Sequence, residues 1–107
     1  MKRQGDILLV PVEKLPAELA EVPRENGRIV LAEGEATGHL HAIEDEKAMF
    51  MATDLNEIEG RFLVVEAEEG VALEHPEHDT ITLDPGLYEV RRQRAYDQAG
   101  GIELVAD

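Results

Sequence analysis

The sequence contains no cysteine, no serine and no tryptophan, and its aromatic content is only 4%. The absence of cysteine excludes disulfide bonds and thiolate ligands, so a soft-metal site in this chain must use imidazole. Serine and cysteine nucleophiles are excluded as well. With so few aromatic residues, we expect a core of Val, Leu, Ile and Ala. No run of 18 apolar residues exists, and the first residues lack the long apolar region of a signal peptide. These absences predict a cytoplasmic protein.

The charge of the chain is strongly one-sided. Its 24 acidic residues against 10 basic ones give a formal net charge of −14. A surface of this sign repels nucleic acid and anionic membranes, and we expect neither as a partner. The length of 107 residues predicts a single domain, residues 1–107, large enough to bury a hydrophobic core without disulfide bonds or structural metal ions.

Short apolar segments alternate with turn residues along the whole chain. Turn signals recur roughly every ten residues, as in sandwiches and barrels. We therefore predict an all-β fold, a small β-barrel or β-sandwich of about eight short strands. Only residues 13–20 favour a helical turn, with Pro16 at its first position. The strand candidates are residues 6–12, 28–33, 40–44, 47–53, 61–66, 71–74, 80–83 and 87–96, with 102–105 as a further edge.

All four histidines fall in two short pairs. His39 and His41 stand two apart on a predicted strand, so both side chains project from one face, while Leu40 and Ala42 face the core. The second pair is spaced differently. His75 and His78 would face opposite ways on a regular strand, but the intervening Pro76 favours a bend that brings both rings to one side.

Two imidazoles from a strand and one or two from a turn form the ligand set of a transition-metal site. The predicted ligands are His39, His41, His75 and His78, and the cofactor is a divalent ion, zinc first, with iron, nickel, cobalt or copper as alternatives. If the protein is an enzyme, the metal would activate water or polarise an oxygen of a small-molecule ligand. The candidate catalytic carboxylates, which would move a proton, are Glu44 and Asp79.

Two other interpretations fit the same residues. The protein is then either a non-catalytic accessory module whose histidines are structural or pH-responsive, or a homo-oligomer that holds metal between subunits. A basic cluster, Arg91, Arg92 and Arg94, is compatible with an anion clamp. The abundance of acidic residues favours ion pairs within the chain instead.

Two resemblances accompany these motifs. The sequence from His39 through His41 to Glu46 resembles the first motif of the cupins. The second cupin motif places a proline and a glycine before its last histidine, whereas Pro85-Gly86 comes after His78 here. That resemblance implies a β-barrel with a histidine metal site. The chain is also similar to a family of small uncharacterised bacterial and phage proteins, which implies that the four histidines belong to a shared pattern. The second resemblance rests on residues 3–6, 34–41, 75–79 and 85–94.

Overall fold

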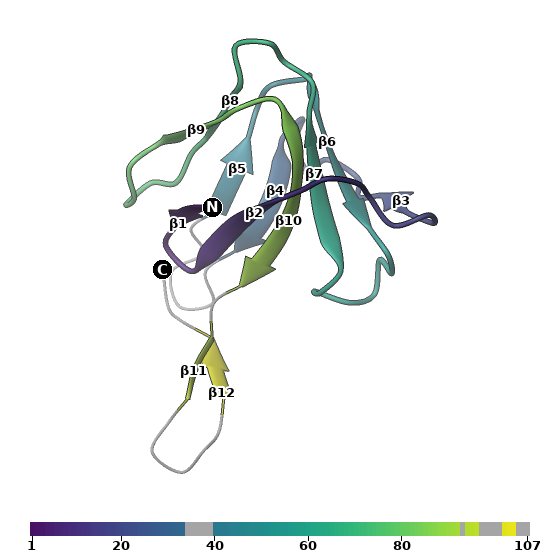
Figure 1. Ribbon diagram of the computed structural model, residues 1–107. Helices are drawn as coiled ribbons and strands as arrows, with labels where there is room; N and C mark the ends of the chain where they lie inside the picture. Colours follow the sequence, from purple (N-terminus) through teal and green to yellow (C-terminus); the bar gives the residue numbers. More distant parts are fainter. Residues whose placement is uncertain (34–39, 93, 97–101, 105–107) are drawn as a thin grey trace.

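A computed structural model describes residues 1–33, 40–92, 94–96 and 102–104 (Figure 1). The described part is all-β, which confirms the predicted fold class. It contains no helix with the length and hydropathy needed to cross a membrane. The strands are β1 (Lys2–Gln4), β2 (Ile7–Val12), β3 (Ala20–Glu21), β4 (Ile29–Glu33), β5 (Leu40–Ile43), β6 (Ala48–Ala52), β7 (Arg61–Val65), β8 (Val71–Leu73), β9 (Ile81–Leu83), β10 (Gly86–Arg92), β11 (Arg94–Tyr96) and β12 (Ile102–Leu104).

Six of these strands form the main antiparallel sheet, in the order β1-β2-β10-β7-β6-β3. The central strand β10 pairs with β2 on one side and with β7 on the other, so the chain's first and last long strands are neighbours. Strands β1 and β3 are the two edges, and the sheet does not close into a barrel. The described residues therefore do not show the β-barrel, which was one of the two predicted architectures, but an open sheet.

A second layer consists of two hairpins, β4-β5 and β8-β9. A bridge joins them, because Ala42 and Glu74 exchange two backbone hydrogen bonds of 2.9 Å. Side chains from both layers meet in one apolar cluster, as expected where two sheets pack face to face. Its fully buried members include Ile7 and Leu9 of β2, Leu63 of β7 and Ile43 of β5. The bridge places the chain around residue 75 beside β5.

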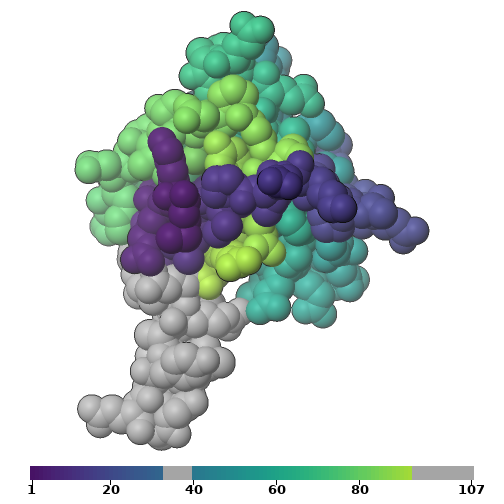
Figure 2. Space-filling view, in the orientation of Figure 1, coloured from purple at the N-terminus to yellow at the C-terminus, as the bar shows by residue number. Residues whose placement is uncertain are grey.

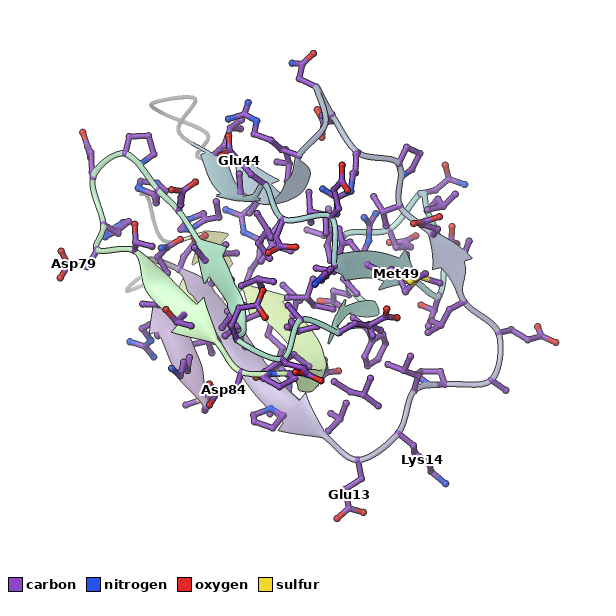
Figure 3. All side chains as sticks on the ribbon, turned by 90° about the horizontal axis from the view of Figure 1, so that it is seen from above. Glu13, Lys14, Glu44, Met49, Asp79 and Asp84 are labelled. Carbon is purple, nitrogen blue, oxygen red and sulfur yellow. The ribbon has the colours of Figure 1, made fainter. Side chains whose placement is uncertain are left out.

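The segment at residues 13–20 is not helical, so that prediction was wrong. It carries the chain from β2, the second strand of the sheet, to β3 at the far edge. Four strand spacings of about 4.8 Å amount to roughly 19 Å. Seven linking residues wound as a helix would cover only about 10 Å, whereas extended backbone reaches easily. The connection is therefore extended, and its first side chains, Glu13 and Lys14, point into solvent (Figure 3).

The chain turns tightly at Asn26-Gly27. Both residues have positive φ, 53° and 78°, and the flanking Glu25 and Arg28 exchange two backbone hydrogen bonds. This is the two-residue turn that Asn-Gly favours. It delivers the chain into β4, whose pairing with β5 positions His41.

Candidate functional site: a buried polar centre

The first two contributors to the site come from the hairpin between β1 and β2. Gln4 ends β1 and lies in register with Ile7, while Asp6 immediately precedes β2. Gly5 between them has φ of 57°, a conformation that allows the tight connection. Gln4 is 3% exposed and Asp6 is fully buried. The hairpin thus carries an amide and a carboxylate into the interior.

His41 is the third contributor, and it is fully buried on β5. The alternation of the strand places His41 on the same face as Ile43, which belongs to the apolar core. We expected Leu40 and Ala42 to face the core, and for Leu40 this was wrong, since it is only half-buried. Ala42 is buried, but it lies outside the core cluster, at the bridge to Glu74. The histidine therefore points inward rather than toward a solvent-facing cleft.

The second histidine pair bends as Pro76 predicts. His75 Nδ1 accepts hydrogen bonds from the backbone N–H groups of Glu77, at 3.0 Å, and His78, at 3.3 Å. This closes a tight turn and brings the rings of His75 and His78 to 4.4 Å between centroids. His75 is buried and His78 is half-buried. The two rings of this pair share one side of the chain.

The three histidines within the described residues, His41, His75 and His78, converge. The ring of His75 lies 4.4 Å from that of His41, and the ring of His78 lies 6.1 Å from His41 and nearly parallel to it. His75 is therefore the nearest neighbour of both other rings. The Nε2 atoms of His75 and His78 are buried from solvent. His39 lies outside the described residues.

Hydrogen bonds fix the tautomers of two of these rings. Gln4 Nε2 donates to the carbonyl oxygens of Leu73, at 2.7 Å, and Asp79, at 2.9 Å, which settles the orientation of its amide. Gln4 Oε1 then faces His41 Nδ1 at 2.8 Å, so this nitrogen carries the hydrogen and donates. The lone pair of a neutral His41 consequently lies on Nε2. In His75 the arrangement is reversed, because Nδ1 is the acceptor and a neutral ring carries its hydrogen on Nε2.

Asp6 connects the histidines to the basic cluster. Its Oδ2 accepts two hydrogen bonds from Arg92, from Nε at 3.0 Å and from an Nη nitrogen at 2.6 Å. Its other oxygen, Oδ1, lies 3.5 Å from His41 Nε2. That separation exceeds the 2.7–3.2 Å of an ordinary N–H···O bond. Asp6 therefore holds Arg92 with one oxygen and presents the other to His41.

The carboxylates predicted as catalytic lie elsewhere. Glu44 and Asp79 have exposed side chains, and Asp79 is at the rim of the molecule (Figure 3). Asp79 contributes only its backbone carbonyl to the buried centre. The residues that sequence reasoning missed are Gln4, Asp6 and, as a partner of Asp6, Arg92. The sequence spacing of Gln4 and Asp6 did not mark them as site residues. Their neighbours in the sequence do not indicate that the β1-β2 hairpin packs against residues 41 and 73.

Two of the three arginines in the cluster, Arg91 and Arg92, pair with acids of the chain, as the composition favoured. Arg91 bonds Glu89 on its own strand, and Arg92 bonds Asp6 across to the neighbouring hairpin. The side chain of Arg94 lies outside the described part. We therefore assign Arg92 to the buried centre, where it balances the charge of Asp6, and find no anion clamp formed by Arg91 and Arg92.

Among the described residues, no group of three or more His, Asp or Glu side chains has the arrangement of a metal site. The buried centre does contain two potential ligand atoms close together, Nε2 of His41 and Oδ1 of Asp6. Each group is also hydrogen-bonded through its other polar atom. Nδ1 of His41 bonds to Gln4, and Oδ2 of Asp6 bonds to Arg92. Supporting contacts of this kind orient metal ligands in known sites.

Comparison with known proteins gives one match. Neither the curated proteins nor the solved structures contain a match to this chain. A family profile described as "Domain of unknown function (DUF8820)" matches residues 3–93, and this span includes every residue of the buried centre. The chain therefore belongs to the family DUF8820, a domain of unknown function.

Proposed function

We propose that the buried polar centre binds one divalent transition metal, with His41 Nε2 and Asp6 Oδ1 as two of its ligands. The observation that carries the proposal is the 3.5 Å between these two atoms. Zinc bonds to nitrogen and oxygen are about 2.0–2.2 Å long, which places two such ligands of one tetrahedral ion about 3.4 Å apart. The spacing is too long for a good hydrogen bond and suits a shared ion.

The tautomer of His41 supports this assignment. A histidine that binds metal through Nε2 usually donates its Nδ1–H to a fixed acceptor, and Gln4 Oε1 is such an acceptor at 2.8 Å. The amide of Gln4 is itself held by two backbone carbonyls. The ring is therefore oriented with its lone pair toward Asp6 before any ion arrives.

The remaining ligands in this proposal are His78 and His39. His78 has a buried Nε2, and its ring stacks 6.1 Å from that of His41. His39 lies two residues before His41, outside the described residues, and was predicted as a ligand from its position on the strand. His75 takes a supporting role, because its Nδ1 accepts two backbone hydrogen bonds and its Nε2 then carries a hydrogen. Zinc suits this mixed imidazole and carboxylate set best.

The burial of the centre favours a closed site over an open catalytic one. Asp6 and His41 are both fully buried, and structural metal sites are closed whereas catalytic sites keep a position for water or substrate. We therefore propose a metal that stabilises the packing of the two sheet layers. The alternative within this proposal is a catalytic metal. In that case the protein would be a metal-dependent enzyme, and a small molecule would need access to the same ion.

The test is metal binding by protein purified without a histidine tag. We expect one Co²⁺ per chain, with the visible absorption bands of a tetrahedral site, and a melting temperature that chelator lowers. His78→Gln and Asp6→Asn should abolish the bands. Glu44→Gln and Asp79→Asn, which change exposed carboxylates, should leave them intact and serve as matched controls.

Three outcomes separate the alternatives. Folded wild-type protein that binds no Co²⁺ or Zn²⁺ and melts identically with and without chelator would leave the histidines as structural residues of an accessory module. One ion per two chains, together with metal-dependent dimerisation, would move the site to a subunit interface. Bands that persist in both His78→Gln and Asp6→Asn would reject the ligand set.

A further inference from the structure

The connection between β6 and β7, residues 53–60, presents two large apolar side chains to solvent. Leu55 is 48% exposed and Ile58 is 57% exposed. Single exposed apolar residues are ordinary on protein surfaces. This pair is unusual because it lies in one short connection, between the acidic residues Asp54, Glu57 and Glu59. The exposure is therefore concentrated rather than scattered.

The connection is held in one conformation. The Arg61 guanidinium donates to the carbonyl oxygens of Leu55, at 3.2 Å, and Glu57, at 2.7 Å. Asp54 Oδ1 accepts a hydrogen bond from the backbone of Asn56 at 2.9 Å, and a backbone bond of 2.9 Å from Thr53 to Gly60 closes the base. A preorganised loop loses little conformational entropy on binding. The two apolar side chains are thus displayed on a rigid support.

A pocket of about 400 Å³ adjoins this connection. It lies between the connection and the end of β10, which are neighbours on the face shown in Figure 2. Ile58 and Val90 supply apolar surface, Glu59 and Glu89 supply carboxylates, and Gly60, Arg91 and Arg92 complete the lining. Both arginines are already engaged by carboxylates, Arg91 by Glu89 and Arg92 by Asp6. Because Glu89 pairs with Arg91, the acidic margin of this apolar wall comes from the exposed Asp54, Glu57 and Glu59 of the connection.

We propose that residues 53–60 and the adjoining pocket form a docking surface for a basic segment of another protein that carries an apolar anchor. The anchor inserts beside Ile58 and Val90, and lysine or arginine side chains meet the acidic residues around it. The net charge of −14 attracts such a partner over distance. A second copy of this chain fits less well, because a symmetric contact would place the acidic margin against itself.

The probes are two fluorescein-labelled peptides, one alternating leucine with lysine and one alternating leucine with glutamate. Fluorescence anisotropy should show saturable binding of the lysine peptide only. A Leu55→Ser/Ile58→Ser variant should weaken that binding about tenfold or more, as expected when an interface anchor is removed. Met49→Ser is the matched control, because Met49 is also an exposed apolar residue but lies on β6 (Figure 3). Amide chemical-shift changes should map to residues 53–60 and 89–92.

The proposal is overturned by any of four results. These are no saturable binding of the lysine peptide, equal binding of the glutamate peptide, equal loss in the Met49→Ser control, or shift changes confined to another face. Sedimentation of the unliganded protein adds a fifth. A dimer that Leu55→Ser/Ile58→Ser dissociates would assign the surface to a second copy of the chain instead. Because neither variant changes a residue of the buried centre, the metal experiment and this one fail independently.

Discussion

Asp6 and Arg92 are 86 residues apart in the sequence and form an ion pair at the edge of the core. Arg92 donates through two nitrogens to Oδ2 of Asp6, at 3.0 and 2.6 Å. The carboxylate is fully buried, whereas the arginine side chain keeps 17% of its surface exposed. The pair joins the first hairpin of the chain to the last strand of the main sheet.

This unequal burial predicts an unequal response to mutation. Arg92→Met leaves a buried carboxylate without its partner and should cost about 3–5 kcal/mol of unfolding free energy. Asp6→Asn leaves an arginine that reaches water, so its cost should be smaller. The double variant should recover part of the Arg92→Met loss. Urea denaturation of the three variants measures this coupling, and strictly additive losses would contradict it.

Gln4 should be a key residue for stability, although it is neither apolar nor charged. Its amide satisfies His41 Nδ1 and the carbonyl oxygen of Leu73, both buried. Gln4→Met keeps the volume but leaves these groups without a partner, at about 1–3 kcal/mol for each. Thermal and urea unfolding should show a loss of that order. Glu13→Gln, an exposed control, should be neutral, and equal stability of the two variants would refute the prediction.

Tyr88 should make the protein sensitive to alkali. Burial raises the pKa of Tyr88 above its ordinary value of 10.0, and the nearby Asp84 carboxylate raises it further. The folded protein therefore holds the phenolic proton more tightly than the unfolded chain. Its contribution to stability is complete below pH 10 and declines as the pH rises toward the folded-state pKa.

Tyr88→Phe isolates this effect. At pH 8 the variant should be about 1 kcal/mol less stable, because the hydrogen bond from Tyr88 to the Asp84 carbonyl is lost. Above pH 10 the wild type should lose stability faster than the variant, so the difference should shrink. Urea unfolding at several pH values measures both curves, and parallel curves would show that Tyr88 does not contribute.

Two glycines with similar backbone conformations should differ in their tolerance of alanine. Gly27 has φ of 78° and open space where a Cβ would lie. Gly70 has φ of 82°, but its Cβ would lie 2.6 Å from the carbonyl oxygen of Leu83. Gly27→Ala should cost about 1–2 kcal/mol for the left-handed conformation alone. Gly70→Ala should cost a further 1–3 kcal/mol, roughly, for the clash. Equal losses on urea denaturation would contradict this account.

The local features of the chain were predictable because they depend on neighbouring residues. Alternating apolar segments predicted an all-β chain, and Pro76 predicted the bend that brings the rings of His75 and His78 together. The edge strands β1 and β3 were missed, since three and two residues are too few to show a pattern. The prediction of a helical turn at residues 13–20 was wrong because the segment must span the distance from β2 to β3. That distance, and not local helix propensity, determines its extended conformation.

The sequence by itself determined the fold class and the bend between His75 and His78, and it predicted the four histidines as candidate ligands. Only the tertiary structure placed Gln4 and Asp6 against His41, and Arg92 behind Asp6. It also placed Glu44 and Asp79 at the surface, although they are closer to the histidines along the chain. The physical reason is that antiparallel pairing of β2 with β10 brings residues 87–92 beside residues 7–12, far apart in the sequence. Such long-range register is encoded by the core as a whole and by no single motif.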